Sequence, residues 1–95
     1  MTPFEQRMAE FHARFLARAA EDADKIEVAL ANADFVALRA VCHGLSGNAG
    51  VFGFGELGAQ AQAVEEAVDA GEPAASVRTR AVELLRQLAG LAQGR

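Results

Sequence analysis

The sequence predicts an all-α protein that folds as an antiparallel up-down-up-down four-helix bundle. Alanine fills 22 of the 95 positions, Tyr and Trp are absent, and the strand-favouring residues are scarce, all of which favours helix. Apolar residues recur at helical spacing in four segments, and only a few residues separate one segment from the next. Such short connections require antiparallel neighbours, and 95 residues suffice for one domain, residues 1–95.

The first helix is predicted over residues 3–31. Thr2, Pro3 and Glu5 supply an N-cap, a proline at the first helical position and the acidic residue of a capping box. The apolar positions that follow are spaced by three or four residues and are expected to face the core: Phe4, Met8, Phe11, Phe15, Ala19, Ala23, Ile26 and Leu30.

A second helix is predicted to begin after Asn32 and Asp34, with Asp34 as its N-cap. Its apolar stripe is Phe35, Leu38, Val41, Cys42, Leu45, Ala49 and Phe52. The density of glycine between Gly50 and Gly55 predicts a bend at the end of this helix.

The third predicted helix ends by Gly71, and the fourth begins at Pro73. Their apolar stripes are Phe54, Leu57, Ala61, Val64 and Val68 for the third, and Val77, Ala81, Leu84, Leu85, Leu88 and Leu91 for the fourth.

The charge balance excludes several classes of partner. The net charge of -4 opposes binding to nucleic acid and to anionic lipid. No apolar run approaches the length of a membrane span, and the first residues do not form a signal peptide, so we expect a cytoplasmic protein. A single cysteine agrees with a reducing compartment and cannot form an internal disulfide.

One histidine of the second helix is predicted to face solvent. At about 100° per residue, His43 lies about 140° from the centre of that helix's apolar stripe. The residues that share its surface patch are small, apart from one arginine: Arg39, Ala40, Ser46, Gly47 and Gly50. By itself the position also fits an ordinary surface histidine.

Glycine inside a helix lowers its stability by about 1 kcal/mol relative to alanine, so the glycines near His43 require an explanation. Glycine beside an exposed imidazole lets another protein approach the ring closely. Tight packing between helices is the competing explanation, which we expect at Gly50 and Gly53 but not at Gly47.

A neutral imidazole with open access can attack phosphorus and form a phosphoramidate. The sequence lacks a Walker-type loop, an acidic cluster near His43 and a Ser-His-Asp arrangement. The chain is therefore expected to be a phosphocarrier without kinase activity of its own, and to obtain its electrophile and metal from a partner.

The segment from His43 to Gly53 resembles the signature of histidine phosphotransfer (HPt) domains, in which His-x-Leu-Lys-Gly is followed by small residues, an apolar residue and Gly. The positions that fall on this pattern are His43, Leu45, Gly47, Ala49, Phe52 and Gly53. The resemblance implies that His43 carries a phosphoryl group on Nε2 between aspartates of receiver domains, with magnesium supplied by the receiver. The small residues beside His43, among them Gly47 and Gly50, are the surface on which we expect the partner to dock.

The sequence departs from that pattern at Ser46, where the family usually has a lysine that helps hold the phosphoryl group. Arg39, one helical turn before His43, is a candidate for the missing positive charge, and Ser46 for a hydrogen bond to a phosphoryl oxygen. An exposed arginine with no role in phosphoryl transfer is the alternative.

Other conspicuous residues are interpreted as structural. Cys42 lies on the apolar stripe and is expected to be buried, and the six phenylalanines are expected in the core. His12 is not expected to be a second phosphoacceptor, and the pair Glu65 and Glu66 is interpreted as a solvated face. No Glu-x-x-His pair is present for a metal site in the bundle.

The leading hypothesis is a phosphorelay intermediate, expected to be monomeric, that exchanges a phosphoryl group with response-regulator receiver domains. A hybrid histidine kinase is a further candidate partner. A phosphoacceptor domain of a chemotaxis-type or hybrid kinase is a related alternative. An adaptor that docks receiver-like partners without accepting phosphate belongs to a different class, and the serine at position 46 keeps it open.

Overall fold

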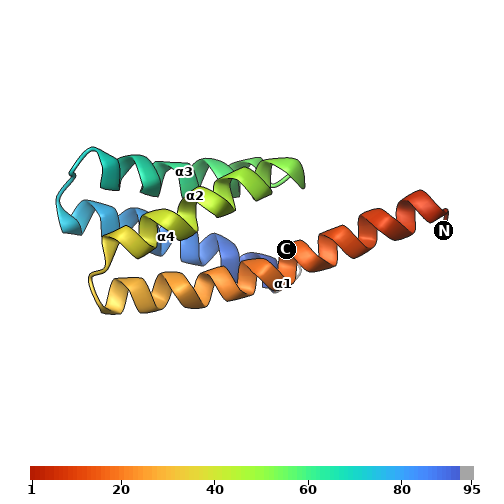
Figure 1. Cartoon of the computed structure of the whole chain (residues 1–95), viewed down its shortest axis with the longest axis horizontal. Coiled ribbons are helices and arrows are strands. Elements are labelled where there is room, and N and C mark those ends of the chain that lie inside the picture. Colours follow the sequence, from red (N-terminus) through yellow and green to blue (C-terminus); the bar gives the residue numbers. More distant parts are fainter. Residues whose placement is uncertain (93–95) are drawn as a thin grey trace.

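The computed structural model describes residues 1–92, and these form four α-helices with no strand among them (Figure 1). The helices are α1 (Pro3–Ala31), α2 (Phe35–Val51), α3 (Gly55–Asp69) and α4 (Ala74–Ala92). The prediction of an all-α four-helix bundle is confirmed, and each helix boundary that the sequence predicts lies within about two residues of the observed one. The last three residues of the expected domain lie outside the described part. None of the described helices is long and apolar enough to cross a membrane.

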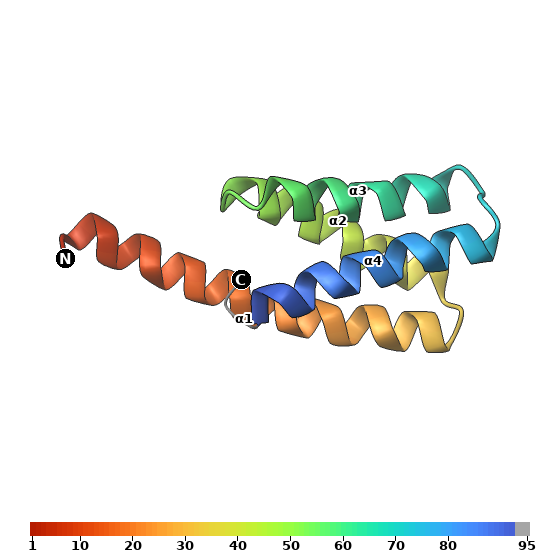
Figure 2. The ribbon, with the colours of Figure 1, turned by 180° about the vertical axis from the view of Figure 1, so that it is seen from behind.

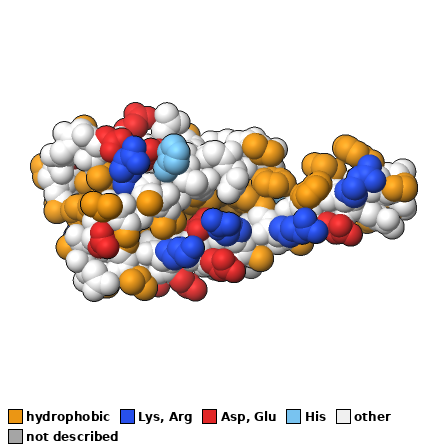
Figure 3. Space-filling model, viewed as in Figure 1, with side chains coloured by type: hydrophobic (Ala, Val, Ile, Leu, Met, Phe, Trp, Pro, Cys, Tyr) orange, Lys and Arg blue, Asp and Glu red, His pale blue; other side chains and the backbone are white. Residues whose placement is uncertain are grey.

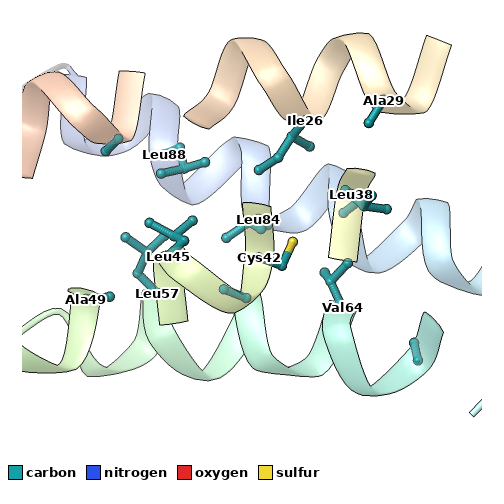
Figure 4. Packing of buried hydrophobic residues seen from close by; sticks show 14 of the residues in the cluster. Ile26, Ala29, Leu38, Cys42, Leu45, Ala49, Leu57, Val64, Leu84 and Leu88 are labelled. Carbon is teal, nitrogen blue, oxygen red and sulfur yellow. The ribbon is translucent and has the colours of Figure 1, made fainter. Parts of the chain in front are cut away.

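The four helices surround one core. α1 packs against α2 and α4, and α3 packs against the same two helices. In Figures 1 and 2 helices adjacent in sequence lie side by side. Ile26, Leu38, Val64 and Leu84, one from each helix, converge around the buried thiol of Cys42 (Figure 4).

Side chains cap the first two helices as predicted. The Thr2 hydroxyl accepts the amide of Glu5 (3.1 Å), and the Glu5 carboxylate accepts the amide of Thr2 (3.2 Å). Asp34 Oδ1 accepts the amide of Ala37 (3.0 Å) at the start of α2. These contacts satisfy amide groups that have no partner inside the helix.

α1, α2 and α3 end in the same way. After each helix one residue adopts a left-handed backbone conformation, with φ of 51° at Ala33, 82° at Gly53 and 67° at Gly71. The next amide then bonds back to a carbonyl in the last turn, as Phe54 does to Ala49 (2.9 Å). Glycine suits this position because it has no Cβ, and Ala33 is the exception.

The N-terminal half of α1 does not reach the core, contrary to the prediction. Phe4, Met8 and Phe11 are 63%, 44% and 41% exposed, and Phe15 is the first buried residue of the chain. α1 is longer than the other helices, and its first turns extend past the end of the bundle (Figure 2). The apolar periodicity of α1 was correct, but the other three helices are too short to cover it.

The closest approach of α2 and α3 depends on Gly58. A Cβ at this position would lie 3.3 Å from the carbonyl oxygen of Ser46 and 3.4 Å from Cβ of Ala49. A Cβ at Gly50 or at Gly53 would meet no atom within 4 Å, so tight packing does not require glycine at either position, contrary to expectation. The amide nitrogen of Gly50 lies at the same contact, 3.7 Å from the Cβ position of Gly58. The glycine that permits contact between the helices lies on α3.

Candidate functional site: the exposed His43

His43 projects from the middle of α2 into solvent, as the sequence predicts. Its side chain is 71% exposed, while its neighbours Cys42 and Leu45 are buried. In Figure 3 a histidine side chain stands at the surface over α2, with basic and acidic side chains on one side and small uncharged groups on the other. A large partner can therefore reach this imidazole.

The imidazole of His43 is held through one of its two nitrogens. Nδ1 lies 2.9 Å from Oε2 of Glu65 on α3. An ionised carboxylate only accepts hydrogen bonds, so Nδ1 carries the proton, and in the neutral ring the lone pair is on Nε2. No hydrogen bond from residues 1–92 occupies Nε2. The ring thus presents its nucleophilic nitrogen outward.

Glu65 is the residue of this site that the sequence analysis missed. Its side chain is only 13% exposed, so the interpretation of Glu65 as part of a solvated face is wrong. A signal was available, because Glu65 lies about 70° from the centre of the apolar stripe of α3, whereas Glu66 lies about 170° away. A carboxylate at the edge of a stripe reaches the neighbouring helix. Only the packing of α2 on α3 showed which residue it meets.

Arg39 lies one turn before His43 but is engaged with two carboxylates. Its guanidinium binds Asp69 through Nε (2.5 Å) and Nη2 (3.1 Å), and Nη2 lies 3.2 Å from Oε2 of Glu65. The hydrogen bond from Arg39 lowers the pKa of Asp69. The same bond and the charge of Asp69 raise the pKa of Arg39. Arg39 thus supports the carboxylate that orients His43, and its charge is largely balanced.

The remaining predicted site residues surround His43 without contacting the ring. The Ser46 hydroxyl donates to the carbonyl oxygen of His43 (2.9 Å), so its proton is used within the helix. A Cβ at Gly47 or at Gly50 would meet no atom of the chain within 4 Å. Packing within the molecule therefore does not explain these two glycines. Because neither has a side chain, nothing projects from the surface beside the imidazole at these positions.

A shallow cavity of about 230 Å³ adjoins this surface between α1 and α2. It is lined by Arg18, Asp22 and Lys25 of α1 and by Ala40, Val41, Gly44 and Leu45 of α2. Ala40 shares the surface patch of His43 because it lies three residues before it. Arg18 is paired with Asp22 (3.6 Å), so Lys25 brings the remaining positive charge to the flank of the site that faces α1, which the sequence alone did not indicate.

Cys42 is buried, as the sequence analysis expects. Burial raises the pKa of the Cys42 thiol to about 12, so it stays protonated at neutral pH. The ring of His12 packs on that of Phe54, with 5.4 Å between the centroids. No cluster of three His, Cys, Asp or Glu side chains suited to a metal ion occurs within residues 1–92.

Comparison with known proteins identifies the family. The model of the Hpt domain family matches residues 10–94, which is most of the chain. Searches of curated proteins and of solved structures return no match. The family match agrees with the four-helix bundle and with the outward-facing histidine found independently in the structure. The chain therefore belongs to the Hpt domain family, whose role is histidine phosphotransfer in phosphorelays.

Proposed function

We propose that His43 accepts a phosphoryl group from the aspartyl phosphate of one receiver domain and passes it to the aspartate of another. The observation that carries this proposal is that the two nitrogens of the imidazole have different roles. Glu65 holds Nδ1 at 2.9 Å, and Nε2 faces solvent. A nucleophile that is oriented and accessible is what transfer between two proteins requires.

The transfer step follows from this geometry. The lone pair of Nε2 attacks phosphorus, an N–P bond forms, and the acyl phosphate P–O bond breaks to release the receiver's carboxylate. The proton on Nδ1 stays in place, so the phosphorylated ring carries positive charge. The carboxylate of Glu65 lies where it stabilises that charge. Attack by a second receiver's aspartate on the same phosphorus reverses these changes.

The positive charge needed at the phosphoryl group comes mainly from the receiver. Arg39 is already shared between Asp69 and Glu65, and the hydroxyl proton of Ser46 is used within α2. A receiver domain supplies magnesium with its own carboxylates, which neutralises the transferring oxygens. Lys25, across the shallow cavity, is placed to attract an acidic partner.

The receiver docks on the low surface of α2 beside His43. Gly47 and Gly50 project no side chain there, so the partner's backbone comes close to Nε2. We also take the helices to be ordered antiparallel, up-down-up-down. The short connections at residues 32–34, 52–54 and 70–73 support this order, which sets Glu65 of α3 opposite His43 of α2.

The decisive experiment incubates the protein with a phosphorylated receiver domain and magnesium and follows an acid-labile, base-stable label. Wild type should acquire the label. His43→Gln should lose it while keeping its helical circular dichroism and melting temperature, because an exposed side chain adds little to packing. His12→Gln is the matched control and should be labelled as wild type is.

Label on the His43→Gln protein would overturn the site assignment. If wild type bound the receiver but never acquired label, the chain would be an adaptor and the proposed transfer would be wrong.

A further inference from the structure

The N-terminal half of α1 leaves an apolar surface uncovered, which we name the α1 ridge: Phe4, Met8 and Phe11. None of residues 1–14 is buried. Figure 3 shows hydrophobic side chains gathered on this protruding part of the helix. The ridge continues directly into the core, because the next residue of the stripe, Phe15, stacks on Phe54 with 4.8 Å between ring centroids.

We propose that the α1 ridge pairs with the ridge of a second copy of this chain in an antiparallel, two-fold dimer. A helical segment of three turns is marginal in water by itself, yet this one begins with a complete capping box. A second copy is the occupant that the spacing of the stripe favours. Phe4, Met8, Phe11 and Phe15 are separated by four, three and four residues, an order that reads the same in both directions.

This symmetry sets the register of the pair. When two such helices run antiparallel, centred between Ala9 and Glu10, Met8 of each copy faces Phe11 of the other. Phe4 of each copy then reaches the end of the other bundle beside Phe15. An isologous contact of this kind is closed, so it ends at two copies.

The end of the bundle has room for the incoming phenylalanine. A cavity of about 490 Å³ opens there between the α2–α3 turn and the C-terminal part of α4. Phe54, Leu57 and Leu91 form its apolar lining and Glu56, Glu83 and Gln87 its polar lining, and Phe54 is the ring that Phe15 already contacts. Helix contact alone would bury less than the roughly 800 Å² per partner of a typical stable complex, and insertion of Phe4 adds to it.

Charge favours this contact over others between copies. The whole chain carries a net charge of -4, which makes most pairs of surfaces repel. Residues 2–15 hold two carboxylates, Glu5 and Glu10, and two guanidiniums, Arg7 and Arg14, so this segment is neutral. The dimer replaces the monomer expected from the sequence and leaves His43, on α2, accessible.

Sedimentation equilibrium over a range of concentrations tests the dimer. Wild type should approach twice the chain mass of 10.0 kDa. Phe11→Glu should weaken association at least tenfold, whereas Val28→Glu, at a 60% exposed apolar position near the C-terminal end of α1, should associate as wild type does. Both variants should keep the wild-type melting profile of the bundle and accept phosphate on His43, so this test is independent of the proposed function.

A mixing experiment tests the register. Met8→Lys and Phe11→Glu should each associate weakly alone, and their equimolar mixture should associate more strongly, because residue 8 of one copy meets residue 11 of the other. A mixture no stronger than its components would overturn the antiparallel pairing. A monomeric wild type would overturn the dimer, and its co-sedimentation with vesicles of neutral and anionic lipid would instead identify a membrane surface as the occupant.

Discussion

The hydrogen bond between Glu65 and His43 determines which nitrogen of the imidazole faces solvent. One carboxylate oxygen of Glu65 accepts from Nδ1 of the imidazole and also receives Nη2 of Arg39 (3.2 Å). Arg39 is held in turn by Asp69. Two ion pairs and one hydrogen bond thus connect α2 to α3, and they fix the ring that would otherwise rotate freely in solvent.

Glu65 is therefore predicted to act as a positioning residue. Glu65→Ala should slow phosphorylation of His43 by about tenfold, in the range that supporting hydrogen-bond partners contribute elsewhere. Glu65→Gln should retain more activity than Glu65→Ala, because the amide oxygen still accepts from Nδ1. Initial rates with one phosphorylated receiver measure the effect, and nitrogen chemical shifts of the imidazole report the tautomer.

A structural role alone would leave the tautomer of His43 unchanged in Glu65→Ala. Equal transfer rates for Glu65→Ala and wild type would contradict the role of this carboxylate. Glu66→Ala, on the exposed side of the same helix, is the control and should behave as wild type does.

At Gly47, substitutions are predicted to affect protein stability and phosphoryl transfer differently. A Cβ at this position meets no atom within 4 Å, so Gly47→Ala should raise the free energy of unfolding by about 1 kcal/mol through helix propensity. Gly47→Leu should be at least as stable as wild type, yet it should slow transfer strongly because the side chain fills the space beside the imidazole. Chemical denaturation and transfer rates, measured on both variants, check this prediction.

If Gly47→Leu transferred phosphate as fast as wild type, the glycine would not serve partner access. The comparison with Gly47→Ala shows whether the size of the side chain sets the loss.

The ends of the helices offer a comparison between two equivalent positions. Ala33 after α1 and Gly71 after α3 both adopt left-handed backbone conformations, with φ of 51° and 67°. In each case the following amide bonds back to the last turn, from Asp34 to Ala29 (2.8 Å) and from Glu72 to Ala67 (3.1 Å). The backbone geometry is the same, but only one of the two residues adopts it without steric cost.

Opposite changes in stability are therefore predicted at these positions. Ala33→Gly should raise the free energy of unfolding by roughly 0.5 to 1 kcal/mol, and Gly71→Ala should lower it by roughly 1 kcal/mol. Urea denaturation of the two variants beside wild type measures both. Changes of the same sign at the two sites would show that the left-handed conformation does not control stability there.

At the scale of the whole molecule, Asp22 is the one charged side chain buried within the described residues. Burial raises its pKa above the ordinary value of 3.8, although the charges of Arg18 and Lys25 oppose the change. A carboxyl group whose pKa is higher in the folded protein favours folding when protonated. The free energy of unfolding therefore falls as the pH rises through that raised pKa and Asp22 ionises. At neutral pH the whole of this loss of stability is present.

Asp22→Asn should accordingly raise the melting temperature at pH 7, and its advantage over wild type should shrink as the pH falls towards 3.8. Melting curves of both proteins between pH 3 and 8 check the prediction. The difference between them isolates Asp22, since all other titrating groups are shared. An advantage that grew on acidification would mean that the ion pair with Arg18 (3.6 Å) outweighs burial.

Most of the fold was predictable because local chemistry determines it. The capping residues Thr2 and Asp34 and the left-handed turn at Gly71 mark helix ends within a few residues of sequence. The exposure of His43 was predictable for the same reason, since its angle from the apolar stripe depends only on helical geometry.

The predictions that were wrong depended on how the helices lie relative to one another. The periodicity of α1 predicts a buried stripe from Phe4 onward, but burial also depends on how far α2, α3 and α4 extend beside it. Close packing was assigned to Gly50 and Gly53, while the glycine that the contact between α2 and α3 requires is Gly58 of α3. Neither fact is encoded in the spacing of a single segment.

The sequence by itself determined the four helices, the core stripe of each and the outward direction of His43, because a helix repeats every 3.6 residues whatever surrounds it. Only the tertiary structure decided that Glu65 holds the imidazole, that Arg39 is balanced by two carboxylates, and that the α1 ridge stays uncovered. These features depend on which helix lies beside which, and at what depth, and packing of the whole chain sets both.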